Sequence, residues 1–191
     1  MTRPTSGFRL LIDALARLNI PYFVGGSVAS SIHGIARATM DVDLVADLKL
    51  EQVETFVAEL RGEFYADAET IKESIAAGRA FNLIHYASSY KFDIFPLRAD
   101  AYSQAEFGRR VSVESSLFSQ EALTFPVASA EDTVLSKLVW YQAGHEASER
   151  QWRDVLGVLR VNKDRQDVPY LREWAAKLFI QDLLERALSQ A

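Results

Sequence analysis

The segment from residue 41 to residue 45 reads Asp-Val-Asp-Leu-Val, so two carboxylates alternate with apolar side chains. Side chains two residues apart in a β-strand point to the same face of a sheet. The pattern therefore predicts a strand that buries Val42 and Leu44 and presents Asp41 and Asp43 together. Two like charges held this close repel each other, and one would ordinarily stay protonated unless a cation removes the conflict. Because Mg²⁺ prefers carboxylate oxygens and is commonly completed by substrate phosphates, we expect a Mg²⁺ site here.

A third carboxylate, Asp93, lies in another predicted strand, residues 91–97, among aromatic and aliphatic neighbours. A lone carboxylate in such a strand is costly to bury unless it is paired or metal-bound. If this strand lies beside the first one, Asp93 joins Asp41 and Asp43, and three such side chains suit a two-metal phosphoryl- or nucleotidyl-transfer site. We expect Asp41, Asp43 and Asp93 to be both metal ligands and catalytic residues. The alternative for Asp93 is an ion pair with Lys91 or with an arginine on a neighbouring strand.

A glycine-rich turn, Gly25-Gly26-Ser27, separates a short apolar strand at residues 22–24 from a predicted helix. Glycines let a backbone approach a phosphate closely, and the free N–H groups at a helix N-terminus attract that anion. The hydroxyl of Ser27 adds a hydrogen-bond donor. The turn is not a P-loop, because the chain has no G-x-x-x-x-G-K-[ST] sequence.

The order of the predicted elements favours a mixed α/β or α+β core followed by helices. The expected strands cover residues 22–24, 41–45, 80–87, 91–97, 109–114 and 122–127, with a hairpin turn at Ser88-Ser89. The expected helices cover residues 49–61, 69–77, 130–143, 148–161 and 168–189, with one more ending before Pro21 and another through Val28, Ile32 and Ile35. We expect a mixed β-sheet core flanked by helices in residues 1–127 and a helical C-terminal segment, residues 128–191, packed on it.

Composition limits the classes of function. The 191 residues carry a formal net charge of −5, and an acidic protein has no general attraction for nucleic acid. A local basic patch remains open, with the candidates Arg109, Arg110, Arg150, Arg153 and Arg160. The absence of cysteine excludes disulfides, thiolate metal sites and a cysteine nucleophile. Charges interrupt the apolar residues near the N-terminus, and no apolar run reaches roughly 18 residues, so we expect a soluble, cytoplasmic protein without a membrane partner.

Three elements in one order, residues 22–27, 37–43 and 92–94, resemble the motif set of the polymerase-β-like nucleotidyltransferase superfamily. In that superfamily a Gly-Gly or Gly-Ser turn is followed by Asp-x-Asp, and a later strand supplies a third aspartate. The resemblance is closest to the AbiEii-like and minimal nucleotidyltransferases of toxin–antitoxin and abortive-infection systems. It extends over residues 20–97 and, more loosely, over residues 130–156. It implies a nucleotidyltransferase-type mixed sheet flanked by helices.

Residues outside the aspartates also match that branch. It often carries an arginine four residues before the first aspartate, where Arg37 stands. It also has a lysine on a C-terminal helix and a basic residue followed by Asp on the next helix, which Lys137 and Arg153-Asp154 resemble. The branch's fuller R-x-K-D-x-x-D run is not reproduced, because Arg153 replaces the lysine and Gly157 stands at the second aspartate.

The resemblance implies transfer of a nucleoside monophosphate from an NTP to an acceptor hydroxyl, assisted by two Mg²⁺ ions. The nucleotide contacts that it implies are Gly25, Gly26, Ser27, Arg37 and Lys137. The acceptor is left open between tRNA, protein and a small molecule, and a toxin or antitoxin partner protein is compatible with the branch. Three alternatives stand beside this one: an aminoglycoside-type nucleotidyltransferase, an NTP-binding or antitoxin-like protein without turnover, and a glycosyltransferase that uses a UDP-sugar.

Lys137 shares a predicted helical face with Thr133, Trp140 and Tyr141. In a functional interpretation, the lysine reaches the triphosphate and an aromatic ring stacks on the base. In the structural interpretation, the helix lies at the edge of the core and the lysine extends to solvent. We expect Trp140 and Trp152 to be core residues.

Overall fold

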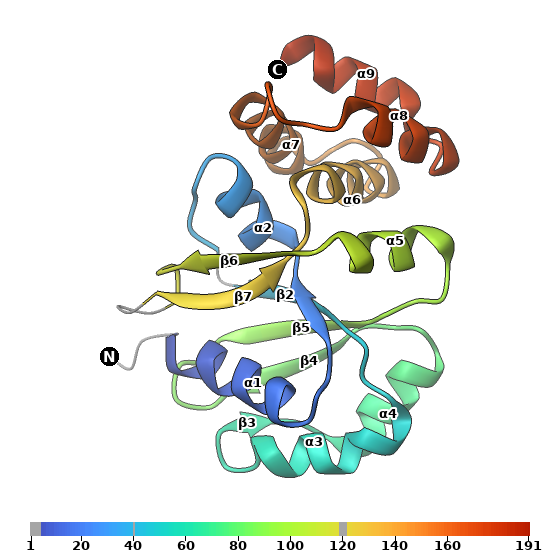
Figure 1. Cartoon of the computed structure of the whole chain (residues 1–191). Helices are drawn as coiled ribbons and strands as arrows, with labels where there is room; N and C mark the ends of the chain where they lie inside the picture. Colours follow the sequence, from blue (N-terminus) through green and yellow to red (C-terminus); the bar gives the residue numbers. More distant parts are fainter. Residues whose placement is uncertain (1–4, 40, 119–121) are drawn as a thin grey trace. The chain divides into compact units, whose positions relative to one another are not determined.

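The computed structural model describes residues 5–39, 41–118 and 122–191 (Figure 1). The chain forms two compact units: the first comprises Met1–Val24 and Met40–Val127, and the second Gly25–Thr39 and Ala128–Ala191. The helical C-terminal residues are thus grouped with the segment that carries the glycine-rich turn, a grouping that the sequence did not suggest. The expected division into residues 1–127 and 128–191, with the second packed on the first, stays a prediction.

The first unit is built on a mixed β-sheet. Its strands are β1 (Tyr22–Val24), β2 (Asp41–Ala46), β3 (Phe64–Tyr65), β4 (Phe81–His85), β5 (Lys91–Pro96), β6 (Val111–Ser115) and β7 (Leu123–Val127). Within the described ranges, these seven strands lie in the order β3-β4-β5-β2-β1-β7-β6. The pairs β2–β5 and β1–β7 are parallel, and the other neighbouring strands are antiparallel. The predicted mixed sheet is therefore confirmed, including the β4–β5 hairpin.

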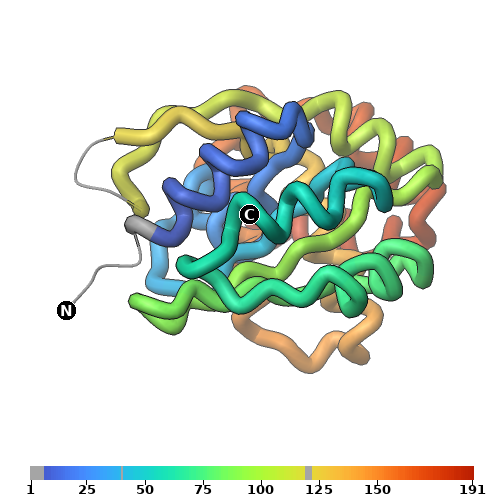
Figure 2. The backbone as a smooth tube through the Cα atoms, turned by 90° about the horizontal axis from the view of Figure 1, so that it is seen from below, coloured from blue at the N-terminus to red at the C-terminus, as the bar shows by residue number. Residues whose placement is uncertain are grey.

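Helices of the first unit include α1 (Thr5–Arg17), α3 (Val53–Leu60), α4 (Ala68–Ala76) and α5 (Ala101–Arg109), and the short 3₁₀ turn η1 (Leu50–Gln52) leads into α3. Figure 2 shows α1 and α3 running side by side across the sheet. The sequence did not predict α5. This helix begins after Asp100, whose carboxylate accepts a hydrogen bond from the backbone N–H of Ser103 and so caps the first turn.

Aromatic packing holds α1 to the sheet of the first unit. The ring of Phe8 stacks on Phe118 with centroids 4.0 Å apart and meets Phe125 of β7 edge-on at 5.0 Å. From β2, Val42 and Leu44 are fully buried, as their alternation with aspartates predicted. Burying side chains of this size contributes roughly 1.5–3 kcal/mol each, so the register of β2 is strongly fixed and its aspartates are held on the opposite face.

The second unit is helical and consists of α2 (Gly26–His33), α6 (Ala130–Ala143), α7 (Glu149–Val161), α8 (Val168–Lys177) and α9 (Gln181–Gln190). The prediction of one helix over residues 168–189 is wrong. Its backbone breaks at Phe179, which has a φ of 58°, and Ile180 N–H bonds back to the carbonyl of Ala175. No helix in the described parts of either unit is long and apolar enough to cross a membrane.

Gly34 allows α2 and α7 to approach closely. A Cβ atom added at Gly34 would lie 2.8 Å from the backbone nitrogen of Val158 and 2.9 Å from the carbonyl carbon of Gly157. A Cβ at Gly157 would in turn reach Ile35 Cγ1 at 3.4 Å. The glycine at position 157, where the related branch has an aspartate, thus lies against an apolar side chain in this fold.

Candidate functional site

The three predicted metal ligands lie on one face of the β2–β5 strand pair. The parallel register places Asp43 beside Asp93 and Asp41 beside Lys91. In β5, the side chains that alternate with Lys91 and Asp93, such as that of Phe92, are buried. The side chains that alternate with the aspartates of β2 are buried in the same way. The predicted adjacency of the two strands is therefore confirmed, and the polar face carries three carboxylates in two neighbouring rows.

One further polar residue extends this face. Asn82 of β4 is the register partner of Asp93, so Asn82, Asp93 and Asp43 form one row across three strands. Asn82 is exposed, whereas Asp43 and Asp93 are half-buried. The sequence gave no reason to select Asn82, because its place depends on the hairpin register. We refer to Asp41, Asp43, Asp93 and Asn82 as the acidic face.

Lys91 lies among these carboxylates. Its Nζ is 2.9 Å from Asp93 Oδ2 and 3.9 Å from Asp41 Oδ1. The alternative partner that the sequence left open for Asp93 is therefore the one present. The hydrogen bond to Asp93 raises the pKa of Lys91, and it outweighs burial, which lowers this pKa; the negative charges of Asp93, Asp41 and Asp43 raise it further. The ammonium group is consequently charged at neutral pH.

The acidic face suits a divalent cation by the chemistry of its donors, because carboxylate and amide oxygens are ligands that Mg²⁺ accepts. In the parts of the chain that the structure describes, however, no three His, Cys, Asp or Glu side chains are gathered closely enough to hold a metal ion. The charge of Lys91 lies instead against two of the carboxylates. The residue types fit the cation, and the charge of Lys91 offsets part of the negative charge of this face.

The glycine-rich turn belongs to the second unit and forms the start of α2. Gly26 has a φ of 54°, a left-handed conformation that glycine adopts without steric cost. Gly25 occupies the cap position, where no side chain satisfies the helix N-terminus. No side chain at the cap position therefore hydrogen-bonds to the first backbone N–H groups of α2. Such a terminus has the geometry and partial positive charge that favour a phosphate group.

Arg37 links the turn to α7 through Asp154. Its Nη2 donates to Ser27 Oγ at 2.7 Å and to Asp154 Oδ2 at 2.8 Å, while Nε donates to Asp154 Oδ1 at 2.9 Å. Lys137 Nζ of α6 donates to the same Asp154 Oδ2 at 2.8 Å. We call Ser27, Arg37, Lys137 and Asp154 the Asp154 cluster.

The Asp154 cluster is shielded from water and carries a net positive charge. The side chains of Asp154 and Lys137 are 7% and 9% exposed, and that of Arg37 is 25% exposed. Burial alone would raise the pKa of Asp154, but the hydrogen bonds and charges of Arg37 and Lys137 outweigh it and hold this pKa below its usual value. The hydrogen bond to Asp154 likewise raises the pKa of Arg37. One carboxylate therefore orients two cations next to the turn.

Asp154 was not among the site residues expected from the sequence, although Arg37 and Lys137 were. The sequence signal was the Arg153-Asp154 pair, which resembles a pair in the related branch. Nothing local in the sequence connects Asp154 with Arg37, which lies 117 residues earlier in the chain. The structure brings together Gly25, Gly26, Ser27, Arg37 and Lys137 in the second unit, and Asp41, Asp43 and Asp93 in the first.

The aromatic residues near Lys137 have divided roles. Tyr141 is buried and its ring lies 5.2 Å from that of Trp152, over which Arg186 places its guanidinium at 4.2 Å. The prediction that Trp140 is a core residue is wrong, since it is 58% exposed. On the helical face of Lys137, the ring of Tyr141 is therefore packed in the interior, and the ring of Trp140 lies at the surface.

The five arginines considered as a basic patch lie in two places. Arg109 and Arg110 are at the end of α5 in the first unit, and Arg150, Arg153 and Arg160 are on α7 in the second. Arg160 is engaged, because its Nη2 donates to the carbonyl of Gln190 at 2.7 Å. A patch that unites all five stays a prediction.

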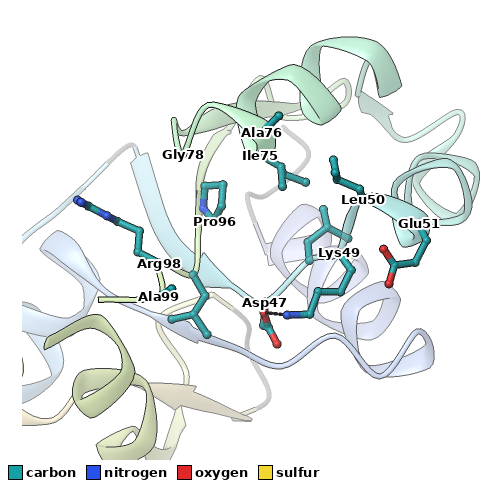
Figure 3. A pocket seen from close by; sticks show the side chains of 12 residues that line it. Asp47, Lys49, Leu50, Glu51, Ile75, Ala76, Gly78, Pro96, Arg98 and Ala99 are labelled. Carbon is teal, nitrogen blue, oxygen red and sulfur yellow. Dashed lines mark hydrogen bonds and ion pairs between the residues drawn. The ribbon is translucent and has the colours of Figure 1, made fainter. Parts of the chain in front are cut away.

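A separate depression of about 530 Å³ lies at the far ends of β2 and β5 (Figure 3). Leu50, Ile75 and Pro96 form apolar parts of its wall, and Lys49 is paired with Asp47 at 2.5 Å across its rim. Because β2 and β5 are parallel and begin at the acidic face, this depression adjoins their opposite ends. It did not follow from any sequence pattern.

Several solved structures that resemble this chain are nucleotidyltransferases or similar to them. The antibiotic-resistance factor ANT(2'')-Ia in solution has a TM-score of 0.51 and 16% identity over 98% of this chain and 97% of that one. Its complex with adenylyl-2''-tobramycin has a TM-score of 0.52 and 14% identity over 92% and 98%. An antigenic nucleotidyltransferase-like protein from Paracoccidioides brasiliensis has a TM-score of 0.52 and 15% identity over 95% and 91%. These likenesses establish the nucleotidyltransferase fold.

The family comparison covers nearly the whole chain. The family described as nucleotidyl transferase AbiEii toxin, type IV toxin–antitoxin system, matches residues 9–189. None of the curated proteins matches the chain. The match spans both the acidic face and the Asp154 cluster, and the fold agrees with it. The chain therefore belongs to the AbiEii nucleotidyltransferase family.

Proposed function

We propose that this protein is a Mg²⁺-dependent nucleotidyltransferase that moves a nucleoside monophosphate from an NTP to an acceptor hydroxyl. The observation that carries the proposal is the register of β2 and β5, which places Asp41, Asp43 and Asp93 on one face opposite a buried hydrophobic layer. A face of three carboxylates is the donor set that two-metal phosphoryl transfer uses. Its occurrence in a chain of a nucleotidyltransferase family supports this reaction over a glycosyl transfer.

The proposal assigns divalent-cation binding to the acidic face. Asp41 and Asp43 would bind both Mg²⁺ ions, and Asp93 would bind the one on the acceptor side. When bound, the cations would offset the negative charge of the triphosphate and acidify the acceptor hydroxyl. Asp93 would help to accept the proton from that hydroxyl, since it lies in the row of the acidic face shared with Asp43.

The proposal assigns the triphosphate to residues of the second unit. The backbone of Gly25 and Gly26 and the hydroxyl of Ser27 would bind phosphate oxygens at the start of α2. Arg37 and Lys137 would offset the charge that grows on the departing pyrophosphate. Their shared hydrogen bonds to Asp154 support this role, because groups that are already oriented lose little conformational freedom when the nucleotide binds.

For the acceptor, we propose a hydroxyl of tRNA or of a protein, with an antitoxin as the functional partner. The description of the family as a type IV toxin supports this class. A cationic small molecule of the aminoglycoside kind is the second candidate, and the formal net charge of −5 favours it. Pyrophosphate release that requires tRNA would favour an RNA acceptor, and release that requires the aminoglycosides would favour a small molecule; the assay below compares the two.

The test is pyrophosphate release from each of the four NTPs with Mg²⁺, with and without bulk tRNA or an aminoglycoside mixture. We expect release by the wild type, its loss in Asp43→Asn, and its retention in the matched control Asp47→Asn, whose carboxylate lies beyond the end of β2. Both variants should keep the wild-type circular dichroism spectrum. Binding of NTP without any release would instead establish a non-catalytic nucleotide-binding protein, and full activity in Asp43→Asn would remove the acidic face from the mechanism.

A further inference from the structure

Lys91 is the one cationic side chain that the register of β2 and β5 places on the acidic face, among the residues the structure describes there. It precedes Asp93 by two positions in β5, so both side chains project from the same face. Its Nζ contacts Asp93 at 2.9 Å and approaches Asp41 to 3.9 Å. The ammonium group therefore lies against an aspartate from each of the two strands.

The charge of Lys91 changes what the acidic face attracts. Three ionised carboxylates carry a charge of −3, and the ammonium group reduces it to −2. The Lys91 side chain is 40% exposed and that of Asp93 is 18% exposed, so the contact with Asp93 is partly protected from screening by water and salt. A divalent cation that binds Asp41 and Asp93 must displace this ammonium group or bind beside it at a cost in repulsion.

We propose that Lys91 is an internal counter-ion that occupies the acidic face in the absence of nucleotide and so lowers its affinity for divalent cations. The inference rests on the proposed function, because it concerns the same three carboxylates. A triphosphate brings negative charge of its own, which compensates for the positive charge of Lys91. Divalent cations would accordingly enter together with the NTP, and the nucleotide-free protein would hold them weakly. Lys91 acts here as a specificity-determining residue for cation loading and is not itself required to touch the reacting atoms.

The experiment measures binding of Mn²⁺ to the nucleotide-free protein by electron paramagnetic resonance, with Mg²⁺ as competitor. The variants are Lys91→Met, which removes the charge, and Lys91→Arg, which retains it. The control is Lys72→Met. Lys72 also contacts two carboxylates of the first unit, Glu54 at 2.6 Å and Glu69 at 2.9 Å, but these residues lie on helices α3 and α4 and not on the acidic face. Lys91→Gln serves as a second neutral variant if Lys91→Met fails to give the wild-type circular dichroism spectrum.

We expect Mn²⁺ to bind the neutral variants roughly fivefold more tightly than the wild type, as removal of one competing ion pair predicts. Lys91→Arg and Lys72→Met should match the wild type, and the difference should shrink when a non-hydrolysable NTP analogue is present. Equal or weaker Mn²⁺ binding in the neutral variants would overturn the inference. That result leaves the proposed function standing if the wild type still releases pyrophosphate and Asp43→Asn does not. Absence of Mn²⁺ binding in every variant, with and without the analogue, would overturn both.

Discussion

Arg37 and Asp154 face each other through two parallel hydrogen bonds, Nε to Oδ1 at 2.9 Å and Nη2 to Oδ2 at 2.8 Å. This bidentate geometry is the strongest common arrangement of an arginine and a carboxylate. Lys137 adds a third bond to the same carboxylate at 2.8 Å. Asp154 is thus the group on which the position of both cations depends, although it would not itself touch the nucleotide in the proposed mechanism.

Replacing Asp154 with Asn should destabilise the protein and reduce its activity. The substitution leaves two cations close together without a compensating charge in a site where Asp154 is 7% exposed. Removal of one partner from a buried ion pair costs about 3–5 kcal/mol, and we expect about 3 kcal/mol because Arg37 is partly exposed. Urea unfolding measures this loss, with Arg153→Gln, an exposed neighbour on the same helix, as the control. A midpoint for Asp154→Asn equal to that of the control would show that the cluster does not stabilise the fold.

The contribution of Asp154 to stability should depend on pH in one direction only. Arg37 and Lys137 hold its folded-state pKa below the usual value, and the pKa of an unfolded aspartate is about 3.9. The stabilisation is therefore complete above about pH 4 and is lost as the pH falls through the folded-state pKa. The difference in unfolding free energy between the wild type and Asp154→Asn should stay constant from about pH 7 to pH 5 and narrow below about pH 4. A difference in unfolding free energy that already narrows between about pH 7 and pH 5 would contradict this assignment.

The acidic face could be anticipated from the sequence because its signal is local. The alternation around Asp41 and Asp43 determines which side chains share a face, and the apolar neighbours of Asp93 indicate a strand. That β2 and β5 lie side by side had to be assumed from the sequence; the register confirms it and shows that the pair is parallel. Lys91 was visible only as one of several partners for Asp93, since its approach to Asp41 depends on that same pairing.

Other features had a weak local signal or none. The break between α8 and α9 falls at Phe179, a residue with positive φ where glycine would have been the expected marker. The helix α5 has no buried residue among those it contains, so it lacks the apolar periodicity by which helices are recognised in a sequence. The bond between Arg37 and Asp154 joins two helical regions 117 residues apart. That bond is a tertiary contact, which no local pattern in the sequence indicates.

Gly34→Ala should destabilise the second unit through a steric clash. The added Cβ would lie 2.8 Å from Val158 N and 2.9 Å from Ser30 O, and neither backbone atom can move without shifting a helix. Overpacking of this kind costs about 1–3 kcal/mol. The matched control is Gly108→Ala in α5, where a Cβ meets nothing within 4 Å, and which should stabilise slightly because alanine favours helices over glycine. Thermal melting of both variants measures the difference, and an unchanged melting temperature for Gly34→Ala would indicate that the helices separate easily.

Ser27→Ala should weaken NTP binding more than it affects the fold. The hydroxyl of Ser27 accepts a hydrogen bond from Arg37 at 2.7 Å and lies in the first turn of α2, where the proposal places the phosphates. Arg37 keeps both bonds to Asp154 after the substitution, so the loss of stability should be about 1 kcal/mol, the net value of one hydrogen bond. We expect the KM for NTP to rise at least roughly tenfold, since a hydrogen bond to a charged group contributes about 1.5–3 kcal/mol and about 1.4 kcal/mol corresponds to a factor of ten. Steady-state pyrophosphate release measures it, with Ser189→Ala on α9 as the control. A Ser27→Ala enzyme with unchanged KM but a lower melting temperature would make Ser27 a structural partner of Arg37 and would place the triphosphate elsewhere.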